Sequence, residues 1–191
     1  ISKPMTSETT SPGFLTEIAG HSISDLAREF GTPVYVYDAA KISQRLADLV
    51  QFDIVRFAQK ACSNIAIVDL VRRCGGLVDC VSAGEVHRAI AAGFTPGQQS
   101  HPPEIGYTAD IFDHEALDLV IEKDIHVNCG SPDMIDQYGQ ASRRVHAPES
   151  SRGITLRINP GFGHGHSQKV NTGGAQSKHG IWHEQLEDCI E

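Results

Sequence analysis

The sequence has no apolar run that approaches the ~20 residues of a membrane-spanning helix. It also has no C-x-x-C pair, and its start lacks the basic, apolar and small residues of a signal peptide. Positive charge is scarce, because 16 Lys and Arg stand against 24 Asp and Glu, for a formal net charge of −8. We therefore expect neither a membrane helix, nor a structural zinc site, nor a nucleic-acid surface.

Cysteine is sparse as well, with five residues among 191. The number is odd, and several of these residues lie beside segments with strand patterns, where a free thiol packs as a small hydrophobic group. This usage predicts a reducing, cytoplasmic compartment without disulfides.

The first fifty residues differ in pattern from the rest. Residues 1–20 are predicted to be a disordered tail that opens with a tag or cloning remnant, since Ser, Thr and Pro dominate its first part. Residues 21–50 predict a lead-in of helix, strand and helix. Ser22 would cap the first helix, which ends at Gly31, and residues 32–38 are extended.

From residue 51 onward, strand and helix patterns alternate with short links. Strands are predicted to end at Lys60 and to occupy 77–81, 105–108, 125–128 and 153–159. Helices are predicted at 65–74, 82–92 and 113–123, from 131, and again from about Trp182, with a polar loop at 141–152. This alternation predicts parallel βα units, about five of them.

Two parallel folds can use such units. A doubly wound sheet normally has a glycine-rich phosphate turn after its first strand, but here that turn holds Lys60. An eight-stranded barrel needs ~250 residues. The predicted fold class is therefore α/β, a partial (β/α)8 TIM-type barrel with an N-terminal helix and strand lead-in.

Lys60 allows two interpretations. It could be a surface lysine whose stem packs against apolar neighbours. It could equally be a partly desolvated amine that forms a Schiff base with a cofactor carbonyl.

Reactive residues of βα barrels lie at the carboxyl ends of the strands. That rule selects Lys60, Asp79, Asn128 and Arg157. Each alone could be a structural ion-pair residue, but together they could bind an anionic aromatic cofactor and an amino acid.

Two motifs around these residues carry a family resemblance. The segments 57–64 (FAQKACSN) and 78–85 (VDCVSAGE) resemble the fold-type III pyridoxal-phosphate decarboxylases, which include the ornithine, arginine and diaminopimelate decarboxylases. The segment 157–182, with its glycine- and histidine-rich loop, narrows the resemblance to the bacterial diaminopimelate decarboxylases. The similarity extends from about His21 to the end of the chain.

The resemblance implies a pyridoxal 5'-phosphate cofactor bound covalently by Lys60, with Asp79 and Arg157 as cofactor-binding residues and Glu85 and Asn128 in support. The resemblance also implies that residues 51–191 form the N-terminal part of the cofactor-binding barrel. The implied reaction is decarboxylation of meso-2,6-diaminopimelate to L-lysine, in a homodimer. The family's phosphate loop, ring-stacking histidine and ring-nitrogen carboxylate match nothing up to residue 191, so the fragment alone is expected to be inactive.

The histidines of this loop could bind a metal ion, with His164, His166 and His179 as the ligands. Their short, glycine-flanked spacing and the lack of a carboxylate in the loop favour a different role. We expect no metal, and we expect His164, His166 and Lys169 to face a dicarboxylic substrate.

Two alternative functions stay open at this point. Another decarboxylase or racemase of the same family could share Lys60 and Asp79. A catalytically silent barrel could act as a binding protein, although it would not need the amine. A half barrel with open edges is also expected to associate with itself.

Overall fold

The computed structural model describes residues 14–146, 152–163 and 171–190. The chain divides into two compact units, Ile1–Arg45 and Leu46–Glu191, each of which is described here by itself. No helix in the described ranges is both long and apolar enough to cross a membrane.

The first unit opens with a small antiparallel hairpin, β1 (Glu17–Ile18) and β2 (His21–Ser22). This hairpin corrects the prediction of a disordered tail up to residue 20, because backbone pairing with β2 orders Glu17 and Ile18. Helix α1 (Ile23–Phe30) follows, and its first turn is capped as predicted: the Asp25 amide donates to Ser22 Oγ over 3.4 Å.

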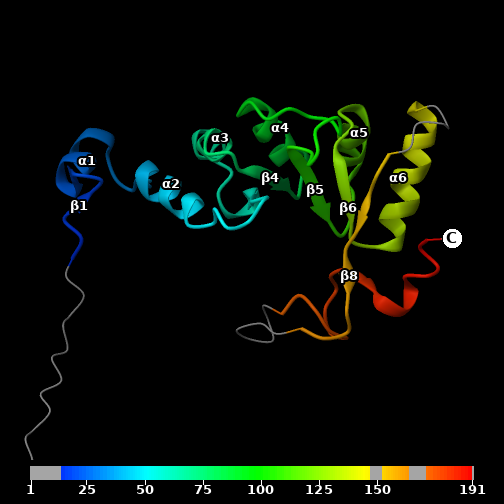
Figure 1. The fold of residues 1–191 in the computed structure, drawn as a ribbon. Helices are drawn as coiled ribbons and strands as arrows, with labels where there is room; N and C mark the ends of the chain where they lie inside the picture. Colours follow the sequence, from blue (N-terminus) through cyan, green and yellow to red (C-terminus); the bar gives the residue numbers. More distant parts are fainter. Residues whose placement is uncertain (1–13, 147–151, 164–170, 191) are drawn as a thin grey trace, which may run out of the picture. The chain divides into compact units, whose positions relative to one another are not determined.

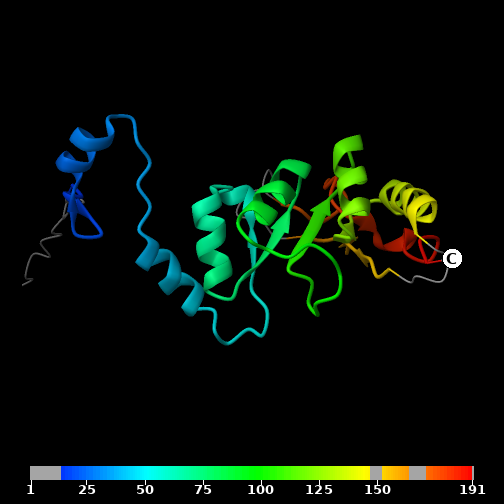
Figure 2. The ribbon, with the colours of Figure 1, turned by 90° about the horizontal axis from the view of Figure 1, so that it is seen from above.

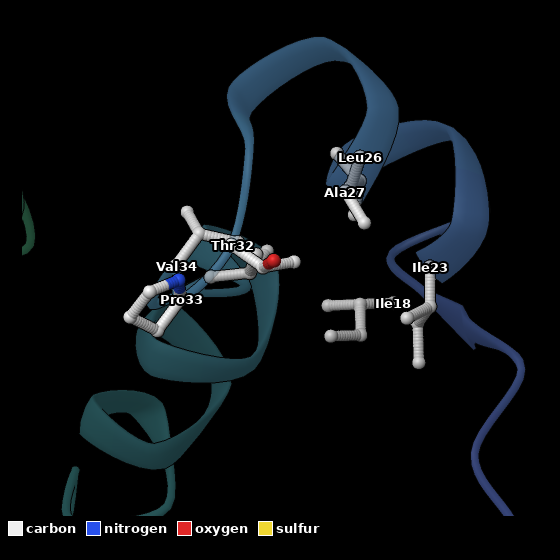
Figure 3. A pocket seen from close by; sticks show the side chains of 8 residues that line it. Ile18, Ile23, Leu26, Ala27, Thr32, Pro33 and Val34 are labelled. Atoms are coloured by element: carbon white, nitrogen blue, oxygen red, sulfur yellow. The ribbon is translucent and has the colours of Figure 1, made fainter.

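The segment 32–38 is not a strand, which corrects the predicted lead-in. It pairs with no strand among the described residues, and Tyr35 and Tyr37 are 88% and 52% exposed. Its first residues and α1 instead line a hollow of about 360 Å³ (Figure 3). None of the described residues that line this hollow has an ionisable side chain, so they offer no group for acid–base chemistry.

The second unit is built on five parallel strands in sequence order, as predicted. These strands are β3 (Arg56–Ala58), β4 (Leu77–Cys80), β5 (Ile105–Ala109), β6 (His126–Cys129) and β7 (Thr155–Leu156). The strands follow one another in sequence order without the reversal of a doubly wound sheet, as the predicted partial barrel requires.

The helices begin where the sequence places capping residues. They are α2 (Ala39–Ala47), α3 (Ile65–Arg73), α4 (Ala83–Ala91), α5 (His114–Glu122) and α6 (Pro132–Val145). The side chains of Asn64, Ser82, Asp113 and Ser131 each accept a backbone N–H of the first turn. Helix α6 continues through part of the predicted polar loop, with Arg143 and Arg144 in its last turn.

The helices α3 to α6 follow one another in chain order along the sheet (Figure 1), and the view from above shows the same progression (Figure 2). Strand residues alternate between two environments. The hydrophobic side chains are buried against helices, and they include Val78, Cys80, Ile105, Val127 and Cys129. Polar residues alternate with them on the opposite face, at Arg56, Asp79, Thr108, Asn128 and Thr155. The functional groups are therefore expected on this polar face.

The predicted strand 153–159 is split in two. After β7, strand β8 (Ile158–Asn159) leaves the five-stranded sheet and pairs in parallel with β9 (Ile181–Trp182). Trp182 therefore ends a strand, and only the short 3-10 helix η3 (His183–Gln185) follows it, which corrects the predicted helix. Between β7 and β8, Arg157 donates its N–H to Cys129 and accepts from Ile181, both over 2.8 Å.

Candidate active site

The ends of the parallel strands surround an open pocket of about 650 Å³ on the polar face. Its lining combines charged groups from five separate segments. These groups, with one histidine, are Lys60, Asp79, Asp110, Asp113, Arg157, Lys178 and His179. The uncharged lining residues are Val81, Tyr107, Thr108, Ala109 and Ile111. Three residues predicted from their strand-end positions, Lys60, Asp79 and Arg157, are thus brought to one pocket.

Lys60 lies in the 3-10 turn η1 (Gln59–Ala61), which follows β3 directly. The turn interrupts the strand direction, and Lys60 is exposed while its neighbour Gln59 is fully buried. The neighbouring side chains therefore point in opposite directions, with the amine on the pocket side. In its neutral form, an amine at this place can attack a carbonyl carbon that enters the pocket.

Gln59 ties this turn to the next βα unit. Its Nε2 donates to the backbone carbonyl of Glu85 over 3.0 Å and contacts Cys80 Sγ at 3.4 Å. Its Oε1 is buried without a hydrogen-bond partner among the described residues. The amide therefore anchors the turn that presents Lys60, at the cost of one unsatisfied acceptor.

Replacing Gln59 with leucine is expected to destabilise the fold by about 1–3 kcal/mol, because the Glu85 carbonyl loses its buried donor. Denaturant unfolding followed by circular dichroism measures this change. Gln51→Leu, at an exposed position, is the matched control and should have little effect. A Gln59→Leu variant as stable as the wild type would show that the amide does not anchor the turn.

Asp79 lies near the end of β4 on the pocket side. Thr108 Oγ1 donates to its Oδ1 over 2.6 Å. Burial raises the pKa of Asp79, and the Thr108 hydrogen bond and the positive charges of Arg56, Lys60 and Arg157 oppose that shift. The carboxylate is therefore placed among cations but is partly removed from water.

Glu85 and Asn128 do not line the pocket. Glu85 is only 8% exposed, and its Oε2 accepts the Val81 amide over 2.8 Å, so it stabilises the turn between β4 and α4. Asn128 lies on the polar face of β6, where its Oδ1 accepts from Thr155 Oγ1. Both residues support the pocket wall rather than contact its contents.

Arg157 and His179 share one carboxylate. Arg157 Nη1 lies 3.3 Å from Asp110 Oδ1, and His179 Nδ1 contacts Asp110 Oδ2. The sequence did not select Asp110, because the predicted strand ended at Thr108, whereas β5 continues to Ala109. With the observed end of β5, the strand-end rule points directly to Asp110.

Tyr107 closes one wall of the pocket. It stacks on Phe112 with a centroid distance of 5.4 Å, and burial raises its pKa to about 12. The phenol therefore stays protonated near neutral pH, and at 2% exposure its ring belongs to the hydrophobic core behind the pocket.

The residues His164, His166 and Lys169 lie outside the described residues, so their predicted contact with substrate stays a prediction. Within the described ranges, no group of three or more His, Cys, Asp and Glu side chains could hold a metal ion. His179, considered above as a metal ligand, pairs with Asp110 instead.

Residues 39–191 match a family model described as pyridoxal-dependent decarboxylase, pyridoxal binding domain. Among curated proteins, the chain is 52% identical to the diaminopimelate decarboxylase of Escherichia coli K12 over 176 residues. That alignment covers 92% of this chain and 40% of the relative. The corresponding protein of Streptomyces coelicolor is 50% identical over 171 residues, which are 90% of this chain and 37% of the relative.

Solved structures agree with these similarities. A crystal structure of a diaminopimelate decarboxylase superimposes with a TM-score of 0.77 at 54% identity, covering 86% of this chain and 37% of that one. The Helicobacter pylori diaminopimelate decarboxylase complexed with L-lysine gives a TM-score of 0.76 at 24% identity, over 87% of this chain and 41% of that one. At that identity the second match supports the fold alone. The chain spans about 40% of the length of the relatives it matches.

Proposed function

Since the chain belongs to the pyridoxal-dependent decarboxylases, with residues 39–191 in their pyridoxal binding domain, we propose that it supplies the lysine-bearing part of a diaminopimelate decarboxylase. The proposed reaction converts meso-2,6-diaminopimelate to L-lysine and carbon dioxide. The observation that carries this proposal is the pocket that unites Lys60, Asp79 and Arg157 in a chain 52% identical to a diaminopimelate decarboxylase.

The described residues fit pyridoxal 5'-phosphate. Lys60 offers the amine that binds its aldehyde, and Arg157 and Lys178 supply positive charge for its anionic groups. When bound, the cofactor supplies a carbonyl carbon and an electron-accepting ring.

The chain's own residues bind and orient. Asp79, held by Thr108, places negative charge near Lys60 and Arg157 at the same pocket. Arg157, held by Asp110, presents a guanidinium that can bind a substrate carboxylate. Gln59 fixes the turn that carries Lys60.

The experiment that tests the function uses the full-length protein with pyridoxal 5'-phosphate and meso-2,6-diaminopimelate. We expect L-lysine and carbon dioxide in equal amounts, measured by amino-acid chromatography and carbon dioxide release. Ornithine and arginine serve as competing substrates. Preferred decarboxylation of either, racemisation without carbon dioxide, or no reaction at all would contradict the proposal.

Homodimerisation and a cytoplasmic location complete the proposal. Strands β3 and β7 each have a neighbour on one side only among the described strands, so this unit offers backbone groups for pairing with further strands of a barrel, and the edges do not by themselves argue for a dimer. No disulfide joins the five cysteines, all of which lie in the described ranges, as a reducing compartment would require. A monomer mass for the full-length protein in sedimentation equilibrium would contradict the dimer.

A further inference from the structure

One side chain in the Lys60 pocket, His179, has no role in the function proposed so far. His179, from the segment before β9, contacts Asp110 Oδ2 through Nδ1, while Arg157 contacts the other oxygen of the same carboxylate. The two partners are 69 residues apart in sequence and both line the pocket. Asp110 thus uses both of its oxygens to hold two pocket residues.

The backbone around Asp110 is built to keep it there. Ser131 Oγ donates to the Asp110 carbonyl over 3.1 Å. A Cβ on Gly130 would lie 2.5 Å from Asp110 Oδ1 and 2.6 Å from the Ala109 carbonyl oxygen, so only glycine leaves room for the carboxylate. Asp110 is therefore held against the start of α6 as well as at the end of β5.

The backbone around His179 is equally constrained. Its N–H donates to Ser177 Oγ over 3.2 Å. The next residue, Gly180, has a φ of +81°, and a Cβ there would lie 3.0 Å from Asn159 N and 3.1 Å from the Arg157 carbonyl oxygen. This close approach brings His179 to the side of the strand that carries Arg157.

The contact with Asp110 determines which ring nitrogen carries the proton. A carboxylate oxygen only accepts hydrogen bonds, so Nδ1 must be the donor. In the neutral ring Nε2 then carries the lone pair. Among the described residues Nε2 has no hydrogen-bond partner, whereas Asp79 is occupied by Thr108 and Asp113 caps α5. Asp79 and Asp113 each use one carboxylate oxygen in these bonds, so His179 Nε2 is the uncommitted imidazole acceptor of the pocket beside their second oxygens.

We propose that His179 is the catalytic base that accepts a proton from the ammonium group of the amino-acid substrate, and that Asp110 is the residue that positions it. This inference rests on the proposed function, because an amino acid enters as R–NH₃⁺ and has no lone pair for attack on a carbonyl carbon. In the step, one N–H bond of the ammonium breaks and its electron pair stays on nitrogen. The proton forms a new N–H bond at His179 Nε2. The products are R–NH₂ and an imidazolium ion whose charge faces Asp110.

The first test needs neither cofactor nor turnover. Ring ¹⁵N chemical shifts of His179 in the cofactor-free full-length protein are expected to show the neutral ring protonated at Nδ1. Asp110→Ala should shift the ring toward the Nε2-protonated form that free imidazole side chains prefer. Asp124→Ala is the matched control, because Asp124 also pairs with an arginine, at 22% exposure against 24% for Asp110. An Nε2-protonated His179 in the wild type would overturn the proposal.

The second test measures kcat/KM for meso-2,6-diaminopimelate. His179→Ala and His179→Gln should each lower kcat/KM on the order of 10²-fold, and added imidazole should restore part of the loss in His179→Ala. Asp110→Ala should lower it less, and Asp124→Ala should keep wild-type activity. Wild-type kcat/KM in His179→Gln, or a His179→Ala variant that folds but does not respond to imidazole, would overturn the proposal.

The two tests separate this inference from the function on which it rests. A wild-type protein that forms no lysine contradicts the proposed function, and the ¹⁵N shifts still show whether Asp110 holds His179 as required. An active wild type with the wrong tautomer contradicts the role of His179 alone.

Discussion

Lys60→Ala in the full-length protein is expected to lower kcat on the order of 10³-fold or more, because the variant loses the amine that binds the cofactor aldehyde. Borohydride reduction of the wild type with pyridoxal 5'-phosphate should leave a pyridoxyl group on the peptide that contains Lys60. The same treatment of Lys60→Ala should leave that peptide unlabelled. Peptide mass spectrometry measures both results.

Lys178→Ala is the matched control, since Lys178 lines the same pocket. It should keep the label on Lys60, even if its cofactor affinity falls. A pyridoxyl group on Lys178 or another lysine in the wild type would show that the strand-end amine is not the attachment site. Full activity in Lys60→Ala would also contradict the proposed chemistry.

Asp79→Asn is expected to change stability and activity in opposite directions. Burial raises the pKa of Asp79, so the folded protein holds this proton more tightly than the unfolded chain does. The resulting contribution to stability is fully present below the unfolded-state pKa and is lost as the pH rises through the raised folded-state pKa. An asparagine side chain does not ionise, so Asp79→Asn does not lose this stability as the pH rises. Its own Oδ1 can still accept the hydrogen bond from the Thr108 hydroxyl.

Thermal unfolding should therefore show a higher Tm for Asp79→Asn than for the wild type at pH 8, with the difference shrinking toward pH 4. At the same time kcat/KM should fall on the order of 10²-fold, because Lys60 and Arg157 lose the negative charge that lies among them. Asn128→Asp is the control. This exchange is also isosteric and changes one charge on the same face of the sheet, but it lies outside the pocket. A variant less stable than the wild type at pH 8 would show that the surrounding cations outweigh the cost of burial.

Local patterns in the sequence predicted most of the second unit. Helix starts at Ser82 and Ser131 depend on a side chain three residues or fewer from the amide it accepts, so neighbouring residues determine them. Neighbouring residues also determine the alternation of strands and helices. Short connections between these elements then make the strands parallel. Because active residues of a barrel lie at strand ends, the strand pattern selected Lys60, Asp79 and Arg157, which line the pocket, together with Asn128, which does not.

The predictions failed where pairing between distant segments decides the outcome. Residues 32–38 have the β-branched and aromatic composition of a strand, but no other strand lies beside them among the described residues. The residues from Trp182 onward have a helix-like pattern. Trp182 nevertheless pairs with Asn159 and so ends a strand. Composition cannot report whether such a partner exists, because the partner lies elsewhere in the chain.

By itself the sequence determined the partial barrel, its family and the lysine at the end of β3, since each depends on residues close together in the chain. The tertiary structure alone decided which side chains surround that lysine. Gln59 reaches Glu85, 26 residues away, and Asp110 reaches His179, 69 residues away. Such contacts depend on strand register and on where the chain leaves the sheet, and the local sequence encodes neither directly.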